Sequence, residues 1–121
     1  MLLVEDDPLI VSMLEQKLAA KGYAVLRALS ESEIDMVLEE HDVGLVLLDI
    51  LLPDLNGLTV LKKIKEDPRY KSIPVLVISN LGQREDIERG LQGGAADYII
   101  KANTYPDEIV ERVEKLLARK Q

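Results

Sequence analysis

The chain contains no cysteine, phenylalanine or tryptophan, and tyrosine is its only aromatic residue. Without cysteine, a disulfide, a thiolate metal site and a catalytic thiol are all excluded. Because aromatic residues make up only 3% of the sequence, we expect Leu, Ile and Val to fill the core. Any chemistry at a site must come from other side chains.

The sequence also lacks an excess of basic residues and a long apolar segment. Its net charge is -7, which argues against direct binding of nucleic acid by this chain. No apolar run is long enough for a membrane helix and no signal-peptide pattern is present, so we expect a cytoplasmic protein without membrane contact. With 121 residues, the chain is long enough for one domain with a real core and too short for two.

Short β-rich runs alternate with amphipathic helical patterns five times. Three of the runs are apolar without alternation, which is typical of parallel strands covered on both faces. Successive right-handed βαβ units predict an α/β fold with a doubly wound parallel sheet, in which ligands bind beyond the carboxyl ends of the strands. We expect strands near 2–5, 24–28, 45–49, 75–79 and 97–100, and helices near 8–21, 30–40, 57–67, 83–92 and from 105 onward.

Local signals support these helix boundaries. Asp7 followed by Pro8 is typical of an N-cap and first turn. Ser30 with Glu33 forms a capping-box pattern at the start of the second helix. Gly93 and Gly94 are better interpreted as a helix stop than as a phosphate loop, because no glycine pattern follows a strand there.

Acidic residues stand at the ends of two predicted strands. Glu5, Asp6 and Asp7 follow the first strand, and Asp49 ends the third. Crowded carboxylates raise one another's pKa and resist dehydration, so a small divalent cation is expected to compensate them. Magnesium prefers about six oxygen ligands. Asp6 and Asp49, Glu5 directly or through water, and the backbone carbonyl of Leu51 would supply the protein's share.

Two further predicted strands end in Ser79 and Lys101, whose side chains suit the binding of phosphate. Asp49 with a free oxygen is a candidate nucleophile that could form an acyl phosphate. Lys101 would hold another phosphoryl oxygen as a mobile point charge, and the Ser79 hydroxyl with nearby backbone N–H groups would bind the rest.

Each residue also has an ordinary structural interpretation. The acids after the first strand could be helix caps alone, above all Asp7. A lone Asp at a strand end is usually a turn former, and a lone Ser or Lys there usually faces solvent. Their joint occurrence on four strand ends favours one shared site.

With these motifs in place, the whole sequence resembles the receiver domains of bacterial two-component response regulators, of the chemotaxis-regulator type. The order and spacing of the matching blocks carry the resemblance. These blocks are residues 4–7 (VEDD), 49–57 (DILLPDLNG), 74–79 (PVLVIS) and 97–101 (DYIIK).

The resemblance implies a flavodoxin-like fold with strand order 2-1-3-4-5 and a single receiver domain over residues 1–121, with no output domain within the chain. It implies a signalling module rather than an enzyme. Its partners would be a histidine kinase or phosphotransfer protein and a downstream effector or output domain, with a homodimer as a further option.

The resemblance also implies roles for individual residues. The phosphorylated state would draw the hydroxyl switch inward and move the aromatic switch, which reshapes the face formed by 83–92, 97–100 and the last helix. The implied roles are phosphoacceptor for Asp49, magnesium-binding acids for Glu5 and Asp6, hydroxyl switch for Ser79, aromatic switch for Tyr98 and phosphate sensor for Lys101.

Three features depart from the family pattern. Ala102 stands where the family usually has proline, and a cis Lys-Ala bond would cost about 2.5–4 kcal/mol, so we expect a trans bond and a shifted loop. Asn80 is larger than the usual residue after the hydroxyl switch and could narrow access to Asp49. We hypothesise that Leu51 and Leu81 hinder the attacking water and prolong the phosphorylated state.

Two other functions fit some of these residues. A magnesium-dependent phosphohydrolase would also combine Asp, Ser and Lys, but such enzymes place a DxD pair on an early strand and carry a cap. A receiver-like scaffold that no longer uses phosphate is favoured by Ala102 and Asn80 and disfavoured by the intact acid pair, Ser79 and Lys101.

Overall fold

A five-stranded parallel sheet forms the centre of the computed structural model, which describes residues 1–80 and 82–118. Every neighbouring pair of its strands is parallel. In sheet order the strands are β2 (Leu26–Arg27), β1 (Leu2–Val4), β3 (Val46–Asp49), β6 (Val75–Ser79) and β7 (Asp97–Ile100). The strand order agrees with the predicted order 2-1-3-4-5. The fourth and fifth strands of the sheet carry the labels β6 and β7, because two short strands outside the sheet precede them along the chain.

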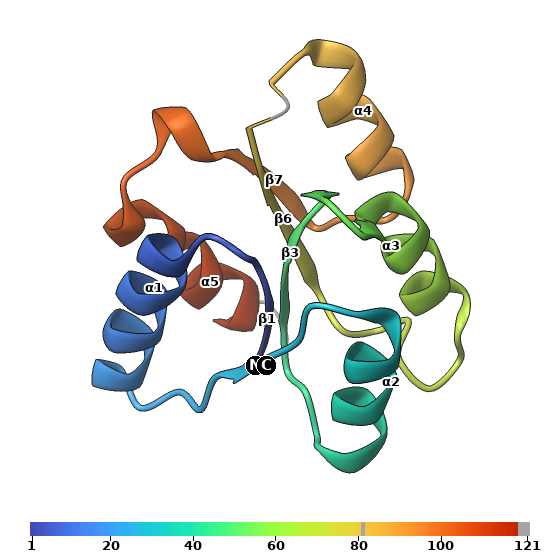
Figure 1. Ribbon diagram of the computed structural model, residues 1–121, viewed down its shortest axis with the longest axis horizontal. Helices are drawn as coiled ribbons and strands as arrows, with labels where there is room; N and C mark the ends of the chain where they lie inside the picture. Colours follow the sequence, from blue (N-terminus) through green and yellow to red (C-terminus); the bar gives the residue numbers. More distant parts are fainter. Residues whose placement is uncertain (81, 119–121) are drawn as a thin grey trace.

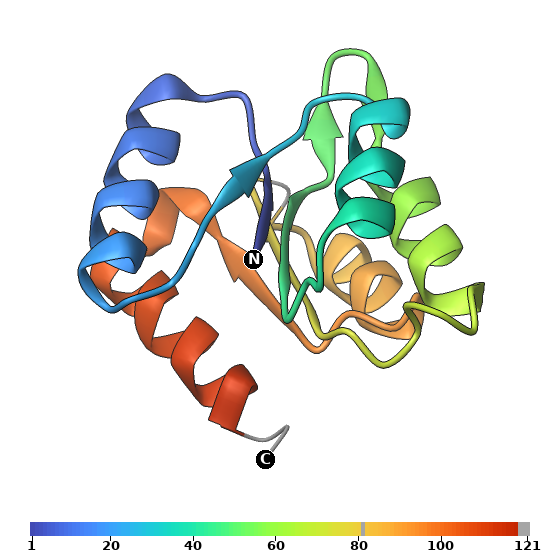
Figure 2. The ribbon, with the colours of Figure 1, turned by 90° about the horizontal axis from the view of Figure 1, so that it is seen from below.

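Five helices cover the sheet in two layers, as predicted (Figure 1). Two of them pack on one face and three on the other, which the second view shows edge-on (Figure 2). The first layer is α1 (Pro8–Ala20) and α5 (Pro106–Ala118); the second is α2 (Glu31–Glu40), α3 (Gly57–Glu66) and α4 (Arg84–Gln92).

The core consists of one apolar cluster on each face of the sheet. Successive side chains of β3 alternate between the clusters: Val46 and Leu48 pack under α2 and α3, whereas Leu47 packs under α1 and α5. All of these positions are fully buried, which explains why the strand sequence is apolar without alternation. Leu, Ile and Val dominate both clusters, as the shortage of aromatic residues predicts.

Some elements differ from the sequence-based expectations. The edge strand β2 has only two residues, one half-buried and one exposed, and it pairs with β1 alone. A small antiparallel pair, β4 (Leu51–Leu52) with β5 (Leu55–Asn56), was not predicted and shapes the loop after Asp49. The short 3₁₀ helix η1 (Lys101–Asn103) after β7 was not predicted either.

Side chains cap the helices near the site. Asp7 accepts a hydrogen bond from the backbone N–H of Leu9 (3.0 Å), which confirms it as the cap of α1. Ser30 accepts from the N–H of Glu33 (3.1 Å), as the capping-box pattern predicts. Asn56 caps α3 in the same way, through the N–H of Leu58 (3.1 Å). These caps fix where α1 and α3 begin beside the carboxyl edge of the sheet.

Gly57 allows α3 to begin against the loop that follows Asp49. A Cβ atom at this position would lie 2.3 Å from the Cα atom of Ile50, which is backbone and cannot move aside cheaply. At Gly44, by contrast, an added Cβ would meet only Leu117 at 3.8 Å, an ordinary contact distance.

We therefore expect Gly57→Ala to lower the free energy of unfolding by about 1–3 kcal/mol or more, the cost of overpacking. Gly44→Ala is the matched control and should change it by no more than about 0.5 kcal/mol. Urea unfolding followed by circular dichroism would measure both. Equal stability of the two variants would contradict the close approach at Gly57.

Candidate functional site

The carboxyl edge of the sheet brings the predicted site residues together. Asp49 ends β3 and Ser79 ends β6, while Glu5 follows β1 and Lys101 follows β7. Glu5 and Asp49 are each 2% exposed and Ser79 is fully buried, whereas Asp6 beside them is exposed. The edge therefore carries buried polar groups at the position where doubly wound sheets bind ligands.

Lys101 connects the two buried carboxylates. Its Nζ donates to both oxygens of Glu5 at 3.0 Å and to Oδ2 of Asp49 at 2.8 Å. Its side chain is only 11% exposed. Since β6 and β3 lie between β7 and β1, the extended lysine side chain links strands that do not pair directly.

The carboxylates are also held by backbone donors. Oδ1 of Asp49 accepts from the N–H of Leu51 at 2.8 Å. Oε1 of Glu5 accepts from the N–H of Asp7 at 3.0 Å. Both acids are therefore fixed in orientation before any ligand arrives, which is what a pre-organised site requires.

The cluster holds two carboxylates and one ammonium group, and their contacts shift the pKa values of Glu5 and Lys101. The pKa of Glu5 is raised to about 7: burial raises it most and the nearby Asp49 adds to the rise, while the hydrogen bonds from Lys101 and from the backbone N–H of Asp7 oppose it. Burial acts to lower the pKa of Lys101, but its hydrogen bonds with Asp49 and Glu5 outweigh that effect and raise it. Two buried carboxylates thus share a single ammonium group, so the site favours additional positive charge.

An acidic trio at this edge has the composition of a magnesium site. Glu5, Asp6 and Asp49 each offer a carboxylate oxygen, and these oxygens lie within 4.8 Å of one another. Hard oxygen donors are the ligands that magnesium prefers. The residues present therefore fit this ion, and the exposed Asp6 gives it a route from solvent.

Tyr98 lies beside Ser79 and against α4. Burial raises the pKa of the Tyr98 hydroxyl, and a hydrogen bond with Ser79 partly offsets the rise. A Cβ atom at Gly90 would lie only 2.9 Å from Cδ2 of the Tyr98 ring. Sequence reasoning missed this role of Gly90, although a glycine inside a helical pattern often signals close packing.

The structure also locates the three departures from the family pattern. Every peptide bond in the described part of the chain is trans, as expected for Lys101–Ala102, and that bond lies within η1. Asn80 is exposed. Leu51 is 56% exposed, while Leu81 lies outside the described residues. Within the described segments, no helix has both the length and the hydropathy needed to span a membrane.

Comparison with known proteins identifies the family. The model of the response regulator receiver domain matches residues 1–114. The chain therefore belongs to the response regulator receiver domains, the signalling modules of two-component systems, which interact with histidine kinases and output domains. Such domains bind magnesium at an acidic pocket, and Glu5, Asp6 and Asp49 form an acidic cluster in this chain whose oxygens could hold a metal ion.

Individual relatives support this assignment. The polar-differentiation response regulator DivK of Brucella ovis is 34% identical over 116 residues, covering 96% of this chain and 94% of the relative. The DNA-binding dual master transcriptional regulator RpaA of Synechocystis is 34% identical over 118 residues, covering 98% of this chain. This chain spans only 48% of RpaA, so it matches about half the length of that relative.

Solved structures give the same fold. The CheY-like receiver domain protein of Methanospirillum hungatei superposes with a TM-score of 0.86 at 28% identity, over 98% of this chain and 92% of that one. The receiver domain of the Francisella response regulator 1452 superposes with a TM-score of 0.87 at 26% identity, over 99% of this chain and 97% of that one. The predicted flavodoxin-like architecture is thereby confirmed.

The raised pKa of Glu5 predicts how stability depends on pH. A folded-state pKa of about 7 against an ordinary value of 4.5 means that the folded protein retains a proton that the unfolded chain releases. This favourable contribution is complete below about pH 4.5 and is lost as the pH rises through 7. Without metal, we expect Glu5 to lower the free energy of unfolding by on the order of 1–3 kcal/mol between pH 5 and 8.

Glu5→Gln should remove most of this dependence of the free energy of unfolding on pH. Glu111→Gln, an exposed control on α5, should retain it. Thermal unfolding in a chelating buffer at several pH values would measure the slopes. A Glu5→Gln slope equal to that of the parent protein would rule out this assignment of the pKa.

Proposed function

We propose that residues 1–121 form one receiver domain that is activated by phosphorylation on Asp49. The observation that supports this best is the partly buried ammonium of Lys101, which lies 2.8 Å from Asp49 at the carboxyl edge of the sheet, where Ser79 is buried. A cation and a hydroxyl around a fixed carboxylate are the groups that a phosphoryl transfer to aspartate needs.

In the proposed reaction, an oxygen of Asp49 attacks the phosphorus atom of a phosphohistidine on a histidine kinase or phosphotransfer protein. The new P–O bond forms as the P–N bond breaks, and the imidazole leaves with the electron pair. Lys101 then pairs with a phosphoryl oxygen in place of the carboxylate oxygen that it holds now. The Ser79 hydroxyl donates a hydrogen bond to another phosphoryl oxygen.

Magnesium is the proposed cofactor, held by Glu5, Asp6, Asp49 and the backbone carbonyl of Leu51. When bound, the ion would neutralise negative charge shared by the carboxylate and the phosphoryl group. Glu5 is tied to Lys101 and to a backbone N–H, so we assign it to orienting the site and to contact with the ion directly or through water. Asp6 is exposed and free to turn toward it.

The proposed switch starts at the hydrogen bond between Ser79 and Tyr98. Phosphoryl oxygens compete for the Ser79 hydroxyl, which releases Tyr98 from that bond. Because the Tyr98 ring packs tightly on Gly90, its movement changes how α4 sits on β7. The face formed by α4, β7 and α5 would then bind a downstream effector, an output domain or a second copy of the chain in the cytoplasm.

We expect acetyl phosphate and magnesium to add one phosphoryl group to the protein, visible by intact mass. Asp49→Ala should abolish the adduct, because the attacking oxygen is lost. Asp54→Ala, which removes an exposed acid from the same loop, should retain it and serves as the control.

An adduct that persists in Asp49→Ala would refute the assignment of the acceptor. No adduct on a folded, magnesium-binding parent protein would instead favour the scaffold interpretation. Turnover of a generic phosphate ester at catalytic rates would revive the phosphohydrolase interpretation.

The lifetime of the phosphorylated state is predicted to depend on Leu51. This side chain is exposed directly beside the acceptor loop, where an apolar group disfavours an ordered attacking water. We expect Leu51→Asn or Leu51→Glu to speed the loss of phosphate severalfold, because a polar side chain there can orient the attacking water; this is less than the roughly 10²–10⁴-fold supplied by a fully positioned acid or base.

The decay of the adduct after removal of acetyl phosphate would measure this effect. Leu91→Asn changes an equally apolar exposed residue on α4 and should leave the decay rate unchanged. Unchanged lifetimes in both Leu51 variants would show that Leu51 does not shield the site.

A further inference from the structure

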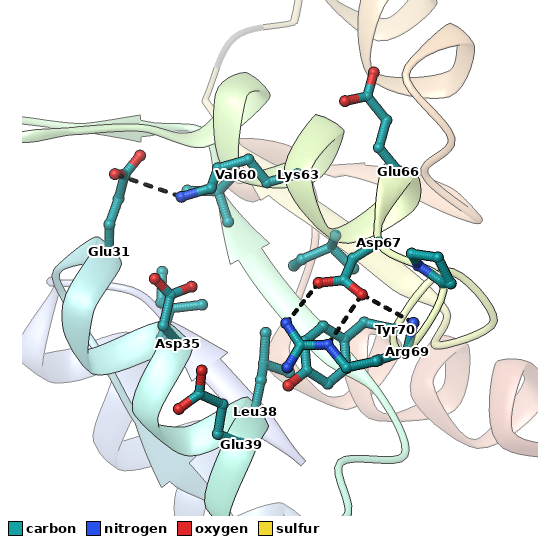
Figure 3. Close-up of a pocket in the computed structure, with 13 residues that line it drawn as sticks. Glu31, Asp35, Leu38, Glu39, Val60, Lys63, Glu66, Asp67, Arg69 and Tyr70 are labelled. Atoms are coloured by element: carbon teal, nitrogen blue, oxygen red, sulfur yellow. Dashed lines mark hydrogen bonds and ion pairs between the residues drawn. The ribbon is translucent and has the colours of Figure 1, made fainter.

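A groove of about 510 Å³ lies between α2 and α3 (Figure 3), and none of its lining residues belongs to the candidate phosphoacceptor site. Its floor is apolar, formed by Ile34 and Leu38 of α2 with Val60 and Ile64 of α3. These side chains belong to the core cluster under these helices, so the floor is rigid. We call this feature the α2–α3 groove.

One wall of the α2–α3 groove is a row of carboxylates on α2. Glu31, Asp35 and Glu39 recur at every fourth position and so share one side of the helix. Glu31 reaches across to Lys63, with 3.8 Å between oxygen and nitrogen. Among the side-chain hydrogen bonds and ion pairs of the described residues, none involves the carboxylate of Asp35 or Glu39. Figure 3 shows both carboxylates beside the groove without a partner.

The opposite wall neutralises this row only in part: Lys63 lies near Glu31, and Glu39 has a weak electrostatic interaction with Arg69. The Arg69 guanidinium donates to both oxygens of Asp67, at 3.2 and 2.9 Å, and lies 4.8 Å from the centre of the Tyr70 ring. Its charge is therefore already paired. The complete lining has a net negative charge of three, from the acids Glu31, Asp35, Glu39, Glu66 and Asp67 against the cations Lys63 and Arg69.

We propose that the α2–α3 groove binds a basic amphipathic helix of a partner protein. An apolar side chain of that helix would rest on the floor, and its Lys or Arg residues would pair with Asp35 and Glu39. A groove between two helices with a narrow apolar floor suits recognition of a helix. The unpaired acids provide the charge complementarity that selects a basic one, and the net charge of -7 attracts it from a distance.

This surface is separate from the proposed switch face. The α3 helix lies between α2 and α4 in their layer of the molecule (Figure 1), so both surfaces can be occupied at once. Binding in the α2–α3 groove requires neither Asp49 nor a phosphoryl group, so its test is independent of the proposed function.

The test uses the full chain labelled with ¹⁵N and a short synthetic peptide with Leu and Lys at helical spacing. Titration should shift backbone amides of α2, α3 and residues 67–70. The variant Asp35→Asn with Glu39→Gln should weaken binding at least about fivefold, as expected for two lost charge pairs. Glu108→Gln with Glu111→Gln removes the same charge from exposed positions on α5 and should weaken it much less.

The remaining outcomes would overturn the proposal. Equal losses in the two double variants would show only long-range attraction to an acidic protein. A peptide with Ala in place of Leu that binds equally well would show that the floor takes no part. Spermidine binding as tightly as the peptide would assign the groove to small cations, and shifts confined to α4, β7 and α5 would place the helix elsewhere.

Discussion

The contact of one partly buried lysine with two buried carboxylates is the constraint on which the rest of the structure depends. Lys101 bonds Glu5 and Asp49 and thereby joins the ends of β7, β1 and β3. Removing one member of such a pair leaves an uncompensated buried charge, which typically costs about 3–5 kcal/mol. Replacing the whole group by apolar side chains would often cost little, so a requirement for stability alone does not explain why charges are kept there.

The charge imbalance of this cluster connects the fold to its function. Two buried acids face one ammonium, and the pKa of Glu5 rises to about 7 as a result of its burial. A site in this condition gains from a divalent cation, and a phosphoryl group on Asp49 offers Lys101 an anionic oxygen in place of the Asp49 carboxylate oxygen that it bonds now. The same edge places Ser79 and Tyr98 in contact, with the ring fitted against Gly90 of α4. Ser79, Tyr98 and Gly90 thus form a short chain of contacts that connects the site around Asp49 to α4.

The fold and the gathering of the candidate site residues at one edge of the sheet were largely predictable because their signals are local. Unbroken apolar runs identify strands covered on both faces, and the polar residue at the end of each run must lie at the carboxyl edge. The sequence could not show that Lys101 spans two intervening strands, because that contact depends on sheet order and side-chain length. It gave no sign of the β4–β5 pair, whose strands are too short for a periodic pattern, or of the α2–α3 groove, which needs two helices side by side.

The central claim is that Lys101 exchanges a carboxylate oxygen for a phosphoryl oxygen when Asp49 is modified. A crystal structure of this chain with magnesium and beryllium fluoride, which imitates the phosphoryl group, would test it most directly. We predict a beryllium fluoride group on Asp49, the Lys101 ammonium bonded to one of its fluorine atoms, and Ser79 bonded to another. An unmodified Asp49 with Lys101 still between Glu5 and Asp49, at saturating concentrations of both reagents, would contradict it.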